Sequence, residues 1–330
     1  CHHNDIAKYI KDNYISEKAM KEMDNDYYYF NYYNFELFSD TFNNKSLLYS
    51  ITCDFYKLAE LLLKESYIDI NKKEEVLSKS YSYDKKLKNH YKLYCEVSPL
   101  LVSINLKKLD FLQLFVSNPN IDVNIKSIEK SFYYLYNDRK LDFDFIEEKS
   151  ALYKAIQKQN IEMTKILLSC PKIDVNNKYI KKKVTGIVVN NEIDLNDPNT
   201  KIQIVADMSL LNIAICYKNY EIVQLLLSNE KIDVNSNEIK YLSKNFMLKY
   251  SPLIIAIKMQ NIKFVQLLLS KDKIDINCKL IKTLNDEINT EKTALYTAAE
   301  TGNIDIIKSL LSFEKIDVNL CDYGDSSPLH

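Results

Sequence analysis

The sequence predicts an all-α protein built from stacked helix–turn–helix units with extended finger loops between them. Three observations carry this prediction: a short phrase that recurs six times, a capped apolar run ahead of each copy, and an insert behind it. The phrase reads Ile-Asp-Val-Asn or a close variant, and its copies end at Asn71, Asn124, Asn176, Asn235, Asn277 and Asn319. Such self-similarity indicates a stacked array, which offers a long surface and seldom a deep catalytic pocket.

Each unit is predicted to open with a helix. A Ser or Thr stands before the apolar run, and Leu follows two positions later in every copy. A hydroxyl at this position caps a helix, because it accepts a hydrogen bond from an orphan backbone N–H. The units begin near 46, 98, 150, 209, 251 and 293, at Ser46, Ser98, Ser150, Ser209, Ser251 and Thr293, and a truncated seventh begins at Ser327.

A tight turn and a second helix are predicted next. An Asn stands ten residues after the cap in four units and tolerates the left-handed conformation that ends a helix; it is Asn160, Asn219, Asn261 or Asn303. In the second helix Val265, Leu268 and Leu269 share one face. The closing phrase alternates like extended chain. We expect its repeated Asp to bond local backbone N–H groups rather than to form an acidic ladder.

This order of helix, turn, helix and finger resembles the ankyrin repeat. Ser327-Pro-Leu-His330 is similar to the usual opening Thr-Pro-Leu-His, and the recurring phrase to the usual close Ala-Asp-Val-Asn. The resemblance covers roughly residues 45–330 and implies an ankyrin-type solenoid. The opening His is replaced in the first six units, so the hydrogen bonds that it usually makes are absent or are rebuilt by Tyr hydroxyls.

Two parts of the chain are distinguished. Residues 45–330 are the predicted ankyrin repeat array, and residues 1–44 are a degenerate ankyrin-like unit or an N-terminal cap with an aromatic-rich segment. The chain starts inside a unit and stops four residues into another, which indicates a fragment of a longer array.

Composition excludes several classes of function. The formal net charge of −1, from 44 Lys+Arg and 45 Asp+Glu, argues against binding to nucleic acid. The apolar runs are much shorter than the roughly 20 residues of a membrane helix, so we expect no membrane insertion. The seven cysteines form no Cys-x-x-Cys pair, which favours a reducing compartment and an intracellular, cytoplasmic location.

No residues are predicted to be catalytic, cofactor-binding or metal-binding, and no small-molecule substrate is expected. Cys1, His2 and His3 could bind a metal, but no second ligand set has suitable spacing, so we interpret them as a coincidence at the terminus. Phosphate-binding and His-Glu-x-x-His motifs do not occur in the sequence. We therefore expect no enzyme.

The inserts distinguish one unit from the next. They span 72–97, 125–149, 177–208, 236–250 and 278–292. The first has a net charge of +3, from seven lysines and four acidic residues, and is either a contact for an acidic or phosphorylated partner or a solvated, flexible loop. The aromatic rings of the second either bind a partner or cover the stack beneath. The third could contain a short hairpin turning at Gly186 or at Asn190-Asn191.

The predicted function is that of a protein–protein interaction scaffold. A partner protein would contact the concave face and the long fingers. The candidate partner-binding residues are Lys85, Lys86, Lys88, Tyr91, Tyr133, Tyr134 and Tyr136. The alternative is a regulatory or targeting array of a larger enzyme or channel.

Overall fold

A computed structural model describes most of the chain after the first 43 residues. The described ranges are 44–66, 68–82, 90–134, 144–185, 188–189, 192–193, 201–243, 246–285, 287–322 and 327–328. They belong to two compact units, one of residues 1–146 with 185–200 and the other of residues 147–184 with 201–330. The predicted division at residue 44 falls next to residues outside the description and stays a prediction.

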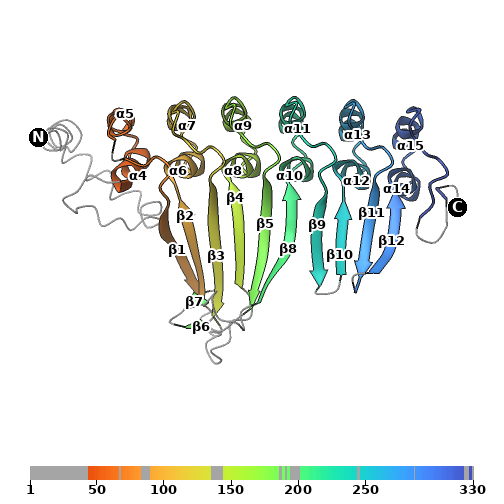
Figure 1. The fold of residues 1–330 in the computed structure, drawn as a ribbon, viewed down its shortest axis with the longest axis horizontal. Coiled ribbons are helices and arrows are strands. Elements are labelled where there is room, and N and C mark those ends of the chain that lie inside the picture. The colour runs from red at the N-terminus through yellow and green to blue at the C-terminus, as the bar shows by residue number, and fades with distance from the viewer. Residues whose placement is uncertain are drawn as a thin grey trace, which may run out of the picture. The chain divides into compact units, whose positions relative to one another are not determined.

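Both units are built on pairs of short helices, as the sequence predicts. The first unit contains α4 (Asn44–Thr52), α5 (Tyr56–Leu62), α6 (Pro99–Asn105) and α7 (Leu109–Val116). The second contains α8 (Ala151–Gln157), α9 (Ile161–Leu168), α10 (Leu210–Cys216), α11 (Tyr220–Leu227), α12 (Pro252–Lys258), α13 (Ile262–Leu269), α14 (Ala294–Thr301) and α15 (Ile304–Leu311). In the second unit the first helix of each pair lies between the second helix and the strands (Figure 1).

The predicted caps of the first helices are confirmed in five units, whereas the predicted cap Ser46 is wrong because it lies inside α4, which begins at Asn44. Each cap hydroxyl accepts the backbone N–H three residues ahead, as Ser251 Oγ does from Ile254 at 3.4 Å. The caps confirmed in this way are Ser98, Ser150, Ser209, Ser251 and Thr293.

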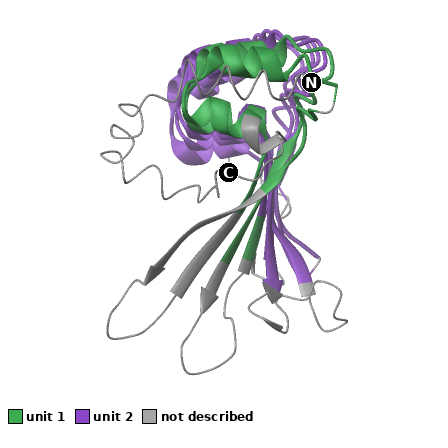
Figure 2. Ribbon diagram, turned by 90° about the vertical axis from the view of Figure 1, so that its left-hand side faces the viewer, with its two compact units in different colours: residues 1–146, 185–200 green, residues 147–184, 201–330 purple. Residues whose placement is uncertain are grey.

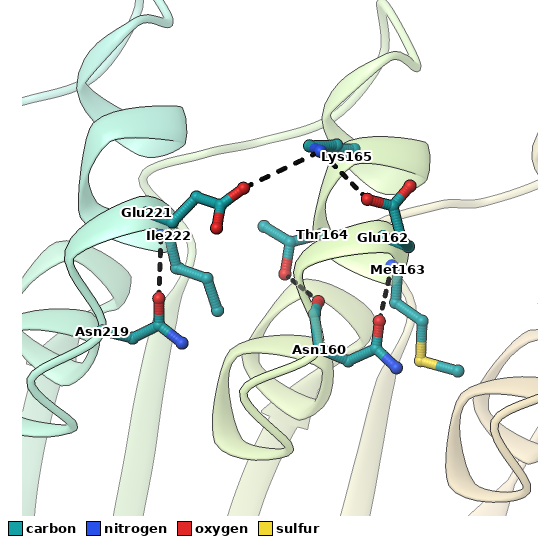
Figure 3. A network of polar contacts seen from close by, with 8 residues as sticks. All are labelled: Asn160, Glu162, Met163, Thr164, Lys165, Asn219, Glu221 and Ile222. Atoms are coloured by element: carbon teal, nitrogen blue, oxygen red, sulfur yellow. Dashed lines mark hydrogen bonds and ion pairs between the residues drawn. The ribbon is translucent and has the colours of Figure 1, made fainter.

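The predicted left-handed Asn is wrong by one residue. Asn219 has a φ of −90° and caps the second helix instead, because its Oδ1 accepts the Ile222 N–H at 3.1 Å (Figure 3). The left-handed residue is the one before each such Asn, at Gln159, Lys218, Gln260 and Gly302. An Asn here satisfies an orphan N–H of the next helix, a gain that the preceding position does not offer.

An ion bridge connects two neighbouring second helices. Lys165 Nζ lies 2.9 Å from Glu162 of its own helix and 3.9 Å from Glu221 of α11 (Figure 3). All three side chains are largely exposed, so this bridge contributes little to stability.

The core of each unit lies between its helices. In the second unit α12 contacts α10, α13 and α14. Leu253, Ala256, Val265 and Leu268 of this region are completely buried, on the helical faces that the sequence pattern predicts.

The predicted all-α class with finger loops is wrong, because the inserts form β-strands. The first unit contains β1 (Glu74–Ser82), β2 (His90–Val97), β3 (Lys126–Tyr134), β6 (Val188–Val189) and β7 (Glu192–Ile193). The second contains β4 (Asp144–Ser150) from residue 147 onward, β5 (Lys178–Thr185), β8 (Lys201–Ser209), β9 (Glu238–Ser243), β10 (Phe246–Tyr250), β11 (Lys279–Leu284) and β12 (Glu287–Thr293).

The strands pair both within a hairpin and between hairpins. In the first unit the order is β1-β2-β3, and in the second it is β4-β5-β8-β9-β10-β11-β12. β10, for example, pairs antiparallel with β9 on one side and with β11 on the other. The short strands β6 and β7 pair on either side of residues 190–191. This is one of the two places where the sequence predicted a hairpin turn. The hairpins of the second unit project together away from its helices (Figure 2).

The recurring phrase is a turn, which corrects the prediction of extended chain. In all six copies the Asp Oδ1 accepts the N–H of the closing Asn at 2.9–3.0 Å. The local role predicted for this Asp is therefore confirmed.

In four copies the closing Asn connects one unit of the repeat to the next. Asn235 Nδ2 donates to the Lys273 carbonyl at 2.8 Å, and its Oδ1 accepts the Asp275 N–H at 2.8 Å. Asn71, Asn176 and Asn277 make the same two bonds to the phrase that follows them. The side-chain amide of each of these Asn residues thus satisfies one backbone carbonyl and one backbone N–H of the next phrase.

Replacing Asn235 by Ala is expected to lower the free energy of unfolding by about 1–2 kcal/mol, because two exposed hydrogen bonds are lost. Asn319→Ala is the matched control: its side chain occupies the same place in the last phrase and bridges to no later phrase among the described residues. Urea denaturation of both variants checks this. Equal losses for the two variants would contradict the bridging role.

Candidate interaction surface

The strands of the second unit form a sheet with two faces, and the strand register shows which side chains lie on each face. Side chains directly opposite each other on paired strands share a face. The printed pairs therefore place Ala206, Lys240, Leu248, Lys282 and Thr290 in one row across β8 to β12. Side chains one residue further along each strand lie on the other face.

The face with this row lies on the side of the first helices. Nearer the helices and on the same face, Tyr179 is buried and stacks on Tyr153 of α8, with ring centroids 4.8 Å apart. Lys292 Nζ likewise lies 2.7 Å from Glu300 of α14. We call this surface the helix-side face.

Three lysines occupy the same position in successive hairpins. Lys181, Lys240 and Lys282 are each the fifth residue after a closing Asn. Two strand spacings separate β5 from β9 and β9 from β11, so the lysines recur about every 10 Å. We call these three residues the lysine row.

Apolar side chains lie beside the lysine row, toward the hairpin ends. Ile202, Ile204 and Leu284 are 52%, 43% and 45% exposed. Phe246 of β10, opposite Leu284, is half-buried there too, and Leu248 is half-buried within the row itself, opposite Lys240 and Lys282. Exposed apolar side chains rimmed by charges are typical of interaction sites.

Lys240 is held by a buried carboxylate. Glu238 has no exposed surface, and its Oε1 accepts from Lys240 Nζ at 2.7 Å and from the Tyr250 hydroxyl at 3.1 Å. Burial alone lowers the pKa of Lys240, but the hydrogen bonds and charge of Glu238, with Tyr250, outweigh burial and raise it. Lys240 therefore stays charged at neutral pH.

In the unit that begins at Ser209, an Asn side chain takes over part of the hydrogen bonding expected of the opening His. Asn212 stands there and is completely buried, and its Nδ2 donates to the Ser236 carbonyl at 3.4 Å. This unit has no Tyr at that position, and here a side-chain amide connects the first helix to the start of the hairpin.

Lys181 is held by a half-buried carboxylate that it shares with Lys149. Glu147 lies 2.6 Å from Lys149 Nζ and 2.9 Å from Lys181 Nζ. Burial raises the pKa of Glu147, but the hydrogen bonds and charges of the two lysines outweigh burial and lower it to about 2. Lys282, by contrast, makes no ion pair with any described residue.

Glu147→Gln is expected to make the free energy of unfolding depend less on pH in the acidic range. A carboxylate with a lowered pKa stabilises the folded state above its ordinary value of 4.5, and this stability is lost as the pH falls toward 2. After allowance for solvent screening the contribution is about 1–2 kcal/mol. Urea midpoints between pH 6 and pH 2 check this; a wild-type slope identical to that of the variant would contradict it.

The candidate residues from the sequence lie in the first unit or outside the description. Lys85, Lys86, Lys88 and Tyr136 fall outside the described residues. Tyr91 lies in β2, and Tyr133 and Tyr134 lie in β3. The backbone register places Tyr91 opposite Tyr133 and His90 opposite Tyr134, so the two predicted inserts do meet.

The lysine row is the feature that the sequence prediction missed. Its signal was present, since each insert of the second unit carries Lys at the same distance from its closing Asn. The composition of each insert hides this signal, which becomes visible only when the inserts are aligned at their closing Asn residues.

The described part of the chain was searched for metal ligands and reactive thiols. There, His, Cys, Asp and Glu nowhere form a group of three or more able to hold a metal ion. Six described cysteines are free thiols, and burial raises the pKa of Cys278 to about 12. Across the same residues, every helix is too short or too polar to cross a membrane.

Family models match two stretches of the chain. The family model of ankyrin repeats in three copies matches residues 181–280, and the model of a single ankyrin repeat matches residues 290–323. A search of curated proteins gave no match. A crystal structure of EF0377, an ankyrin repeat protein, aligns with a TM-score of 0.40 at 18% identity, over 70% of this chain and 87% of that one. Residues 181–280 and 290–323, where capped helix pairs recur between the inserts, are therefore ankyrin repeats.

Proposed function

We propose that this chain is a protein-interaction scaffold without catalytic activity, and that it holds a partner protein against its first helices and hairpins. Ankyrin repeats are in general protein–protein interaction modules. The single observation that supports this use of the hairpins is the helix-side face, where exposed apolar side chains lie beside the lysine row.

The hairpins suit this role because their strands are already paired. A surface held by a hydrogen-bonded ladder loses little conformational entropy when a partner binds, whereas a flexible loop must be ordered at that moment. In the first unit the same proposal assigns Tyr91 and Tyr133, which the register brings together, to the contact.

Cross-linking mass spectrometry on the captured complex tests this proposal. Lysine-reactive cross-links to the partner are expected at Lys282 and Lys292 of the hairpins. Cross-links confined to the exposed Lys165, Lys263 and Lys308 of the second helices would contradict it.

A pair of matched variants sharpens the test. Leu284 and Ile288 are 45% and 41% exposed and lie on opposite faces, since Ile288 is paired with Thr283. Leu284→Asp is expected to weaken capture of the partner by about tenfold, and Ile288→Asp to leave it unchanged. The reverse order would place the partner on the other face.

A further inference from the structure

We infer that the outer edge of β12 accepts an extended strand of a partner protein, which adds to the sheet of the second unit as one more antiparallel strand. This inference goes beyond the proposed function, because it concerns the edge of the sheet and not its helix-side face. Three observations carry it: the place of β12 in the sheet, the backbone groups along its outer edge, and the way in which earlier strands of the sheet already pair.

β12 is the last strand of the sheet in the second unit. The strand order ends with β11 and β12, and β12 lies at the end of the row of strands (Figure 1). The insert of the unit that follows has only seven residues, 320–326, whereas the insert that forms β11 and most of β12 has fifteen, 278–292. A chain that follows the seven residues of β12 and returns needs about fourteen residues, so the short insert cannot cover this edge. Its described residues, 320–322, belong to no strand.

The strand register shows which backbone groups of β12 point outward. The Ala294 N–H donates to the Cys278 carbonyl at 3.0 Å, which makes these two residues a hydrogen-bonded pair at the start of the ladder. Bonded and non-bonded pairs alternate along an antiparallel ladder. The pair Ile281–Glu291 is therefore not bonded, and the Glu291 N–H and C=O point away from β11. Such groups along an edge are complementary to another strand.

Two earlier strands of the second unit accept a strand at the matching place. Lys249 of β10 stands two residues before a helix cap, as Glu291 does, and it is opposite Ile281 of β11. Asp207 of β8 also stands two residues before its cap and is opposite Ile239 of β9. The outer edge of β12 thus continues an interface that the sheet already forms twice, and a strand is the occupant that fits it.

The charged side chains near this edge already have partners. Glu291 pairs with Lys279 at 3.1 Å, and Lys292 pairs with Glu300 at 2.7 Å. Recognition of the added strand therefore depends on main-chain hydrogen bonds rather than on charge, as is usual when a strand adds to a sheet edge.

A bulge restricts which strands fit this edge. The register of β11 and β12 shifts after the pair Lys282–Thr290, and Asn289 is the extra residue. Bulges at sheet edges limit indiscriminate pairing, and this one leaves Thr290 to Thr293 as the regular part of the edge. Because few backbone groups are offered, a partner strand that is already held straight in a hairpin is favoured over a flexible segment, which must be ordered on binding.

The test uses the full chain and a labelled, cyclised hairpin peptide in fluorescence anisotropy. The probe has the sequence of residues 279–293, whose first strand pairs with β10 in the chain. The control peptide carries N-methyl groups on Ile281 and Thr283, whose N–H groups point toward β10 and not toward β12 by the same alternation. The probe is expected to bind about tenfold more tightly than this control, and its affinity to change less than about twofold between low and high salt.

Two variants of one residue separate the backbone from the side chain. Glu291→Pro removes an N–H that points outward and no bond to β11, a place where a sheet tolerates Pro. It is expected to weaken binding of the probe about tenfold. Glu291→Ala loses the same side chain but keeps the N–H, and is expected to bind the probe within about twofold of the wild type. Circular dichroism and urea denaturation check that Glu291→Pro is folded; if it is not, the N-methylated control decides.

Several results would overturn the inference. Equal binding of the probe and its N-methylated control would show that main-chain bonds do not hold it, and equal binding to wild type and Glu291→Pro would place it elsewhere. A dimer of the free chain that Glu291→Pro dissociates, measured by sedimentation equilibrium, would make a second copy the occupant instead of a partner. None of these results decides the proposed function, which Leu284→Asp tests separately on the helix-side face.

Discussion

Leu268→Ala is expected to lower the free energy of unfolding by about 2–5 kcal/mol. Leu268 is completely buried in α13, which contacts α12, α11 and α15. The truncation leaves a cavity that the surrounding helices fill only in part, so both the transfer free energy and the packing are lost. Urea denaturation followed by circular dichroism measures the change.

The control for this variant is a leucine at the end of another second helix. Leu311 of α15 is 48% exposed, so Leu311→Ala should cost less than about 1 kcal/mol. In a stacked array the loss also spreads first to neighbouring units, and limited proteolysis should cut the Leu268→Ala variant near α12 and α13. Unchanged resistance to proteolysis, or equal losses for the two leucines, would refute the assigned packing.

The second large effect is expected at the buried carboxylate of β9. Glu238→Ala should lower the free energy of unfolding by about 2–4 kcal/mol, because Lys240 and Tyr250 lose their shared acceptor and a cavity remains. The equivalent position of the next hairpin is the buried Leu280. Glu238→Leu should therefore cost less than Glu238→Ala, since it fills the same space and leaves Lys240 free to reach water.

These two variants separate packing from charge. Equal losses for Glu238→Ala and Glu238→Leu would mean that the ion pair carries the whole effect, which contradicts this expectation. A neutral Glu238→Ala would show that the cluster contributes nothing to stability. Both are measured by urea denaturation at neutral pH, where Lys240 is charged.

The helices could be predicted from the sequence because their signals are local. Ser251 and its counterparts cap helices through a bond to a residue three positions away, and Val265, Leu268 and Leu269 repeat at helical spacing. Where a local rule allowed two outcomes the prediction failed. Asn219 could have ended one helix or begun the next, and the stronger preference of Asn for a helix cap decided this.

The strands were missed because their stability depends on neighbours distant in sequence. β10 is bonded to β9 of its own hairpin but also to β11, and the paired residues of β10 and β11 lie 32 to 38 positions apart in the sequence. Some local signals were nevertheless present. Asn285 has a φ of 52° in the short connection between β11 and β12, and Asn in a two-residue connection is typical of a hairpin turn.

The sequence points to the inserts as the kind of surface that binds a partner, but not to the residues of the surface that we propose. The sequence pointed to the inserts as the binding surface, and the proposed surface does lie on inserts. Local composition favours Lys85 and Tyr136, whereas the lysine row depends on the register that aligns Lys181, Lys240 and Lys282 across several strands. A one-residue change of register would move any of them to the other face.

Hydrogen exchange of the free, full chain tests most directly whether the inserts form a paired sheet that can serve as a binding surface. The structure predicts that backbone amides in β9 to β12, between Glu238 and Thr293, exchange far more slowly than those of an unstructured peptide, because both edges of β10 and β11 are bonded to neighbouring strands. Exchange of these strands at the unprotected rate, with the helices α12 and α13 still protected, would contradict the sheet and with it the helix-side face.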